Sequence, residues 1–307
     1  MVNRRIILGA GTAGIATTGA LLYRAAPSFW NQYAAEWKRD IAPPSAVPDV
    51  KHWPDQGLHV AWLGHSTTLL KIEGFTIITD PVFSDRAGVS LGVTTLGVKR
   101  LVAPALEISG LPEVDLILLS HAHMDHFDLP SLRRLESKQV DVVTASQTSD
   151  LLRVPKYKSI SEMKWGEAKQ VGPATIRGLE VNHWGARVRT DTFRGYNGYL
   201  IQVGRYRVLF AGDTANTDKL RGISNSVDLA IMPIGAYNPW IHYHCNPEQA
   251  WRMTQEARAE HVLPVHHSTF QLSREPIAEP LERLQNAAGA HSNRIVVHSI
   301  GQEFHLA

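Results

Sequence analysis

Four side chains that can bind metal lie within six positions of this sequence, at His121, His123, Asp125 and His126. They directly follow residues 115–120, an apolar run that predicts a buried strand. Zinc and similar divalent metals take imidazole and carboxylate ligands at near-tetrahedral geometry. Four such residues cannot easily share one ion, but His121 and His123 can serve one ion and Asp125 and His126 a second. The alternative, a solvated loop of coincidental histidines, is disfavoured by this density.

The lone cysteine narrows the set of possible metal ligands. Among 307 residues the chain has 15 His but only one Cys, Cys245. One cysteine can neither close an internal disulfide nor build a Cys-rich structural zinc site. Although His244 precedes Cys245, sequence neighbours rarely form a nucleophile–base pair, and a lone cysteine usually packs in a core. Any metal must therefore be held by nitrogen and oxygen.

Three more candidate residues are weak signals when taken singly. His183, Asp213 and His266 each follow a predicted strand, and a strand-ending residue of this kind is more often structural. Each nevertheless has the same position relative to its strand as the first cluster. The fold can therefore bring all of them together at one sheet edge.

The elements that must position these residues are short strands followed by strands and helices in alternation. Strands are expected over 59–63, 68–72, 75–79, 115–120, 140–144, 174–181, 197–203, 206–211, 228–232, 262–265 and 295–298. Helices are expected over 129–135, 216–222, 247–259 and 276–288. This order predicts an α/β fold of two packed sheets flanked by helices, in one domain of about 250 residues.

The charge of the chain is unevenly distributed. Residues 1–40 carry five basic and two acidic side chains, a net charge of +3. Because the whole chain has 31 Lys and Arg against 29 Asp and Glu, the remaining residues hold 26 against 27, or −1. A near-neutral body lacks the basic surface that nucleic acid requires, so no nucleic-acid partner is expected.

The N-terminal residues have the pattern of a signal or an anchor. Arg4 and Arg5 precede an uncharged stretch over 6–22, which is at the short end for a membrane-spanning helix. A basic start before an apolar core is also the pattern of an export signal. We therefore expect a membrane-associated location, at a bacterial inner membrane or exported to the periplasm, with residues 1–26 either cleaved or kept as the anchor. A buried N-terminal helix is the alternative.

The ordered set of ligand-type residues resembles the metallo-β-lactamase superfamily, whose fold is an αββα sandwich with two mixed sheets flanked by helices and a dinuclear metal site at one sheet edge. Further motifs resemble the branch of N-acyl-phosphatidylethanolamine-hydrolysing phospholipase D and its bacterial relatives. They lie at 62–67 (WLGHST), 79–84 (TDPVFS), 182–184 (NHW), 210–214 (FAGDT), 233–237 (PIGAY) and 266–270 (HHSTF).

The resemblance implies two zinc ions per chain and a role for each candidate residue. One zinc would be held by His121, His123 and His183, the other by Asp125, His126 and His266, and Asp213 would bridge both. Asp80 would support the ligands from behind, and His244 would lie near the substrate. The resemblance makes His65 and Ser66 structural rather than catalytic.

The same resemblance implies a zinc-dependent hydrolase, in which a metal-bridging hydroxide attacks the phosphorus of an N-acylated phosphatidylethanolamine or similar lipid. Asp125, Asp213 and His244 would be the catalytic residues. A lactonase or other small-ester or amide hydrolase of the same fold is the alternative, and a non-catalytic binding protein is a third. Trp240, Ile241 and Tyr243 would line an acyl-chain channel or pack in the core.

The chain is accordingly divided into three parts. Residues 1–40 form a hydrophobic signal or anchor segment and a helix, 41–56 a Pro-rich linker, and 57–307 the hydrolase domain. The expected partners are a phospholipid or other small ester, a membrane surface reached through the N-terminal segment, and a second copy of the chain in a homodimer.

Overall fold

The computed structural model describes residues 27–92, 95–188 and 190–307, and it divides into two units, Met1–Asp40 and Ile41–Ala307. The first unit contains helix α2 (Pro27–Trp37). The second contains every candidate residue named above. The three-part division predicted from the sequence stays a prediction.

Two mixed sheets form the second unit in the described part of the chain. The strands of the first sheet, in spatial order β15-β1-β2-β3-β6-β7-β8, are β15 (Glu303–Leu306), β1 (Leu58–Gly64), β2 (Thr67–Ile72), β3 (Phe75–Thr79), β6 (Leu116–Leu119), β7 (Asp141–Ala145) and β8 (Ser159–Met163). Those of the second, in order β14-β13-β12-β11-β10-β9, are β14 (Ala259–Val265), β13 (Val227–Pro233), β12 (Tyr206–Phe210), β11 (Gly198–Val203), β10 (Ala174–Leu179) and β9 (Ala168–Val171). A separate hairpin pairs β4 (Arg86–Ser90) with β5 (Thr95–Lys99).

The direction of the strands decides where their ends meet. In the first sheet β3, β6, β7 and β8 run parallel, and in the second sheet β12, β13 and β14 do. Parallel strands need crossover connections, which α3 (Leu129–Arg134) supplies between β6 and β7 and α4 (Pro247–Glu256) between β13 and β14. The carboxyl ends of the parallel strands in each sheet therefore lie at one edge.

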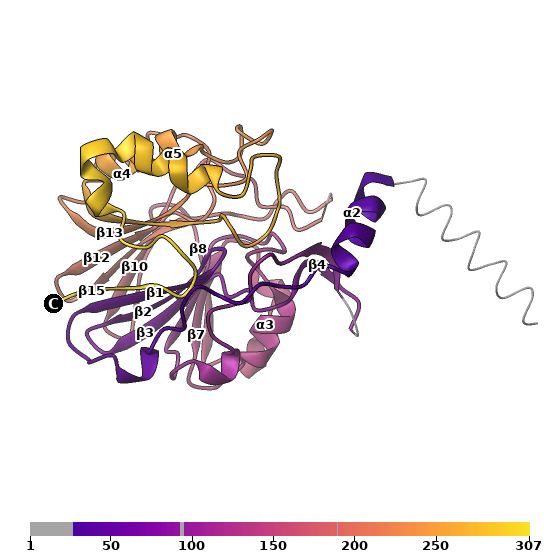
Figure 1. Ribbon diagram of the computed structural model, residues 1–307. Coiled ribbons are helices and arrows are strands. Elements are labelled where there is room, and N and C mark those ends of the chain that lie inside the picture. The colour runs from indigo at the N-terminus through magenta and orange to yellow at the C-terminus, as the bar shows by residue number, and fades with distance from the viewer. Residues whose placement is uncertain (1–26, 93–94, 189) are drawn as a thin grey trace, which may run out of the picture. The chain divides into compact units, whose positions relative to one another are not determined.

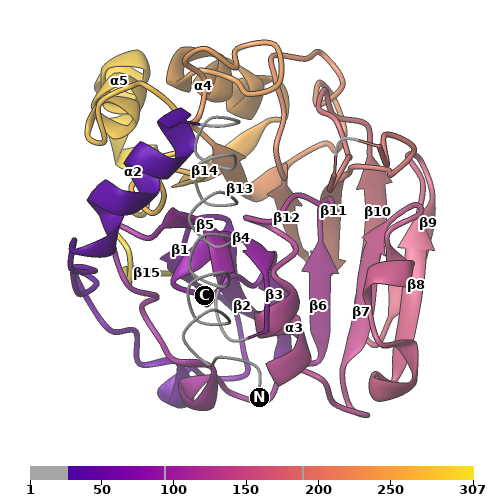
Figure 2. The same cartoon turned by 90° about the vertical axis from the view of Figure 1, so that its right-hand side faces the viewer.

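Helices cover the outer faces of both sheets. In Figure 1, α4 and α5 (Glu279–Ala288) lie over β12 and β13, whereas α3 lies on the side of β7. Figure 2 shows β6, β7 and β8 side by side with α3 next to them. The largest hydrophobic core joins side chains of both sheets, and a second core joins the second sheet to α4 and α5. The predicted αββα sandwich is confirmed.

Helix α4 shows how the sequence sets an element that borders the candidate site. Its Asn246 cap accepts a hydrogen bond from the backbone N–H of Gln249 at 2.9 Å, while the Gln249 side chain accepts one from the Asn246 N–H at 3.0 Å. Such a reciprocal capping box satisfies two N–H groups that a helix start would otherwise leave without partners. The start of α4 at Pro247, three residues after His244, is thereby fixed.

Two predicted elements are absent from the described residues. Residues 216–222 form turns rather than a helix, because only Leu220 of this polar segment is fully buried and no apolar stripe holds a helix against the core. Residues 295–298 make one isolated bridge, from Ile295 to Val262, instead of a strand.

The expected membrane location is wrong for the part of the protein that the structure describes. The predicted signal or anchor, residues 1–26, lies outside the described residues. Within them, no helix combines the length and the apolar character needed to cross a bilayer. This finding corrects the expectation of an inner-membrane or periplasmic protein.

Candidate metal centre

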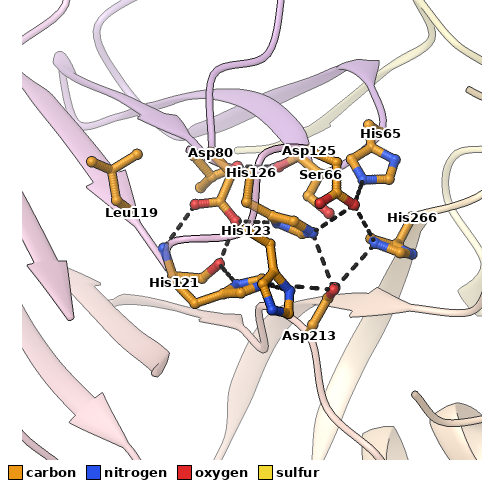
Figure 3. A network of polar contacts seen from close by, with 12 residues as sticks. His65, Ser66, Asp80, Leu119, His121, His123, Asp125, His126, Asp213 and His266 are labelled. Atoms are coloured by element: carbon orange, nitrogen blue, oxygen red, sulfur yellow. Dashed lines mark hydrogen bonds and ion pairs between the residues drawn. The ribbon is translucent and has the colours of Figure 1, made fainter. Parts of the chain in front are cut away.

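The strand ends of both sheets bring the candidate residues to one edge of the sandwich. From the first sheet come Asp80, which follows β3, and the segment 121–126, which follows β6. From the second come His183, Asp213 and His266, which follow β10, β12 and β14. Figure 3 shows the side chains that it labels among them pointing toward one another, with Asp213 facing His126 and His266, and His183 Nε2 lies 3.8 Å from Asp213 Oδ2. All seven candidate ligands therefore meet in one place.

Glycines allow the two sheets to approach at this edge. Gly212 has φ +58°, and a Cβ there would lie 2.8 Å from both Ser120 Cβ and the Asn197 carbonyl oxygen. A Cβ on Gly235 would lie 2.2 Å from the carbonyl oxygen of His266. A side chain at position 212 would push the loop that carries Asp213 away from Ser120 of the first sheet, and one at position 235 would push away the loop that carries His266.

The first group of donor atoms contains three histidines. His123 Nδ1 lies 2.8 Å from His121 Nε2 and 3.2 Å from His183 Nε2. Asp213 Oδ2 lies 3.8 Å from both of those Nε2 atoms. Four donor atoms thus surround one point.

The second group shares the same carboxylate oxygen. Asp213 Oδ2 lies 3.1 Å from His126 Nε2 and 3.2 Å from His266 Nε2. Asp125 Oδ2 lies 3.6 Å and 3.4 Å from the same two nitrogens. Asp213 therefore occupies the position between the two groups, as a bridging residue must.

The donor set fits a pair of divalent ions. Four buried atoms of the cluster, His126 Nε2, His266 Nε2 and both Asp213 carboxylate oxygens, have no hydrogen-bond partner among the described residues. Leaving such an atom unsatisfied costs about 1–3 kcal/mol, and a cation would satisfy all four. Tetrahedral zinc places neighbouring donors about 3.3 Å apart, close to the 2.8–3.8 Å distances found here. Nitrogen and carboxylate oxygen are also ligands that zinc accepts.

The electrostatics of the cluster favour a cation. Burial raises the pKa of the Asp213 carboxyl, but His126 and His266 outweigh it and hold that pKa well below its ordinary value. Burial lowers the pKa of His266, but Asp213 and Asp125 raise it to about 9. Burial lowers the pKa of His121 and of His183 well below the ordinary value. The carboxylates of Asp213 and Asp125, whose pKa values are both held low, therefore supply negative charge. The neutral His121 and His183 supply lone pairs.

Partners behind the histidines fix which nitrogen faces the cluster. His126 Nδ1 lies 2.7 Å from Asp80 Oδ2, and His183 Nδ1 lies 2.8 Å from the Tyr243 carbonyl oxygen. Because a carboxylate and a carbonyl only accept hydrogen bonds, each of these Nδ1 atoms carries the hydrogen. The Nε2 atom of each ring is then left with its lone pair toward Asp213.

Asp80 should be essential to both stability and metal affinity. Its Oδ1 accepts a hydrogen bond from the Ser120 N–H at 2.7 Å, and its Oδ2 accepts one from His126. We expect Asp80→Ala to lower the free energy of unfolding by about 3–5 kcal/mol, because it leaves these donors buried without partners. We expect zinc affinity to fall about 10–100-fold.

Urea unfolding and competition with a zinc chelator measure the two effects. Asp115→Ala is the matched control, since Asp115 accepts one backbone hydrogen bond, from Thr76, at the opposite end of the same pair of strands. It should cost about 1 kcal/mol and leave zinc affinity unchanged. An Asp80→Ala chain that unfolds and binds zinc like the wild type would contradict the role given to Asp80.

A cavity of about 360 Å³ opens above the cluster. His123, Asp125, Asp213 and His244 form its polar part, and Met124, Ala186, Ala236 and Leu272 contribute apolar atoms. Three aromatic side chains also line it although they are 43–50% exposed, namely Trp184, Trp240 and Tyr243. The sequence left Trp240 and Tyr243 open between core packing and a channel, and their exposure places them at the cavity.

His244 and Cys245 differ in their surroundings. His244 lines the cavity and its Nδ1 lies 3.7 Å from Asp213 Oδ2, and its role near a substrate stays a prediction. Cys245 is fully buried, and this burial raises the pKa of its thiol to about 12. It is therefore no nucleophile, as the sequence had suggested.

The sequence did not indicate Arg187 at the site, and it assigned His65 a structural place only. Arg187 lines the cavity and donates from Nη1 to the carbonyl oxygens of Ala122 and Phe127, at 3.0 and 2.8 Å, which ties it to the loop of the first cluster. His65 Nε2 lies 3.0 Å from Asp125 Oδ2. The sequence placed His65 after a buried strand and inside the motif at 62–67, but neither feature indicated a contact with Asp125.

Comparison with known proteins identifies one matching family and several similar proteins. Residues 76–267 match the family described as the Beta-lactamase superfamily domain. An uncharacterized protein of Mycobacterium tuberculosis is 33% identical over 276 residues, which covers 86% of this chain and 73% of that protein. The N-acyl-phosphatidylethanolamine-hydrolyzing phospholipase D 1 of Caenorhabditis elegans is 29% identical over 259 residues, covering 78% and 72%.

Among solved structures, Igni18, a novel metallo hydrolase from the archaeon Ignicoccus hospitalis, is similar with a TM-score of 0.62. Its sequence is 20% identical, and the match covers 82% of this chain and 99% of that one. At this identity the likeness concerns the fold.

Proposed function

Because this chain belongs to the metallo-β-lactamase superfamily and is a metal-dependent hydrolase of that fold, we propose that it is a phosphodiesterase of the phospholipase D type. The proposed substrate is an N-acylated phosphatidylethanolamine or a similar lipid. The similarity to the worm enzyme of that name supports this choice. The observation that carries the proposal is the bridging position of Asp213 beneath a cavity with aromatic walls.

We propose two zinc ions per chain. The residues that would hold them are His121, His123 and His183 for one, Asp125, His126 and His266 for the other, and Asp213 for both. When bound, such a pair of ions supplies a water that is ionised near neutral pH and neutralises negative charge on phosphoryl oxygens. The protein's own part is to hold these donors at the distances given above.

The reaction exchanges one bond at phosphorus for another. The oxygen of water joins phosphorus while the P–O bond to the head alcohol breaks, and one proton of the water goes to the departing alkoxide. His244 lines the cavity beside Asp213 and is placed to hold this proton. The products are a phosphatidic acid and an N-acylated ethanolamine.

The walls of the cavity suit an apolar substrate. Trp240, Tyr243 and Leu272 can contact the hydrocarbon of an acyl chain, while Arg187 brings one positive charge for an anionic group. The hydrolase fold suggests a small-molecule substrate. A lactone or an amide therefore stays the alternative substrate for this cavity. The homodimer expected from the sequence stays a prediction.

A substrate panel with zinc-loaded protein tests the proposal. N-acyl-phosphatidylethanolamine, plain phosphatidylethanolamine, a lactone and a β-lactam are compared by mass spectrometry of their products. In ¹⁸O-water the label should enter the phosphatidic acid and not the released alcohol, because the bond to phosphorus is the one that forms. Hydrolysis of the lactone or β-lactam without turnover of either phospholipid would refute a phosphodiesterase.

Trp240 should contribute to binding rather than to the chemical step. Trp240 lines the wall of the cavity and is not one of the proposed metal ligands, so Trp240→Ala should raise KM about 5–10-fold and leave kcat within a factor of about two. Steady-state kinetics on the best substrate of the panel measure both constants. Trp165→Ala is the matched control, since Trp165 is 43% exposed, close to the 50% of Trp240, but lines a separate cavity. Equal changes in the two variants would show that Trp240 does not touch the substrate.

A further inference from the structure

The backbone of His65 is held in an unfavourable conformation. Its φ is +52°, in the left-handed region that a residue with a Cβ seldom adopts. Three contacts keep it there. The Trp62 Nε1–H donates to the His65 carbonyl oxygen at 2.8 Å, the His266 N–H donates to the same oxygen at 3.1 Å, and the His65 N–H donates to Thr269 Oγ1 at 2.6 Å. Strain maintained by so many contacts is typical of functional positions.

This backbone directs the imidazole ring at Asp125. His65 Nε2 lies 3.0 Å from Asp125 Oδ2, and the ring is buried against His266 and Phe270. A carboxylate can only accept hydrogen bonds, so the hydrogen of the ring lies on Nε2. Figure 3 shows this contact on the side of Asp125 away from Asp80.

The oxygen that His65 contacts is the one that faces the second group of donors. Asp125 Oδ2 lies 3.4 Å from His266 Nε2 and 3.6 Å from His126 Nε2, so its contact with His65 is the shortest of the three. His126 and His183 each have a partner behind them that fixes their orientation, Asp80 and the Tyr243 carbonyl. His65 gives Asp125 the equivalent support.

We propose that His65 is a positioning residue that orients the Asp125 carboxylate and thereby sets the metal affinity of the position shared by Asp125, His126 and His266. The proposal rests on the dinuclear centre of the proposed function. It assigns to His65 a role that the sequence pattern had left as structural.

Two substitutions separate positioning from packing. His65→Ala removes the hydrogen bond, whereas His65→Gln replaces Nε2–H by an amide N–H that can reach the same oxygen. His59→Gln is the matched control, because His59 is also buried but lies near the start of β1, close to His305, whereas His65 directly follows the end of that strand.

The readout is metal affinity, measured by chelator competition with zinc and by the absorption spectrum of the cobalt-loaded protein. We expect His65→Ala to weaken one of the two metal equivalents about 10–100-fold and to leave the other unchanged. His65→Gln should recover most of the loss, and His59→Gln should bind metal like the wild type. Urea unfolding of the metal-free variants checks that each remains folded.

Three outcomes would overturn the proposal: unchanged affinity in His65→Ala, no recovery in His65→Gln, or equal weakening of both equivalents. A wild-type chain that binds fewer than two metal ions would overturn it together with the dinuclear centre. A wild-type chain that binds two ions and hydrolyses no phosphodiester would contradict the proposed function alone, since none of these affinities depends on the substrate.

Discussion

Replacing Asp213 with asparagine is expected to lower kcat for the phosphodiester by about 10³-fold or more, because the transition-state stabilisation that a metal pair supplies amounts to several kcal/mol. Asparagine keeps the size of the side chain but removes the negative charge. It also removes the oxygen that lies 3.1–3.8 Å from four histidine nitrogens, two in each group. The variant should therefore lose metal as well as activity.

Steady-state kinetics and elemental analysis of the purified variant measure both losses. Asp228→Asn serves as the control, since Asp228 accepts a hydrogen bond from the Arg207 backbone on β12, the same strand that leads to Asp213. This control should keep its metal and its turnover. If Asp213→Asn retained full activity, neither the bridging role nor the proposed chemistry could stand.

Removing the metal ions should lower the unfolding temperature by roughly 8–16 °C. Ligand present at 1,000 times its Kd contributes about 4.1 kcal/mol, and in a domain of this size 1 kcal/mol corresponds to about 2–4 °C. The physical reason is that His126 Nε2, His266 Nε2 and both Asp213 carboxylate oxygens are buried without a hydrogen-bond partner among the described residues, and a bound metal ion would satisfy them. Calorimetry before and after dialysis against a chelator measures the change, and added zinc should restore it.

The Asp213→Asn variant provides the control for this measurement as well. Because it lacks the shared oxygen, the chelator should change its unfolding temperature by less than a third of the wild-type change. A wild-type protein whose unfolding temperature moves by less than about 2 °C would show that the cluster is not a tightly occupied metal site.

The sequence predicted the fold and most of the cluster because the signals were local or shared by a family. The segment from His121 to His126 is dense enough to indicate a metal site without help. His183, Asp213 and His266 became convincing only through the resemblance, since their proximity depends on how two sheets pack and no local pattern contains that information.

What the sequence could not predict depends on contacts between distant segments. His65 and Asp125 are 60 positions apart, and the role of His65 becomes visible only when β1 and the loop after β6 are both in place. The sequence could not predict the exposure of Trp240 either, because an aromatic residue in a loop fits a core as well as a cavity wall. The helix expected over 216–222 failed because propensity alone does not form a helix that lacks a surface to pack on.

Each group of donors takes half of its members from each sheet. His121 and His123 meet His183 and Asp213, and Asp125 and His126 meet His266 and Asp213. A chain in which only one sheet has formed therefore offers only two of the four donors of each group, which is a weak chelate. Metal uptake must then be a late event in folding, and incompletely folded chains release an ion instead of being trapped by it. A chain that holds both metal ions would in this way be one in which the two sheets have packed in their native arrangement.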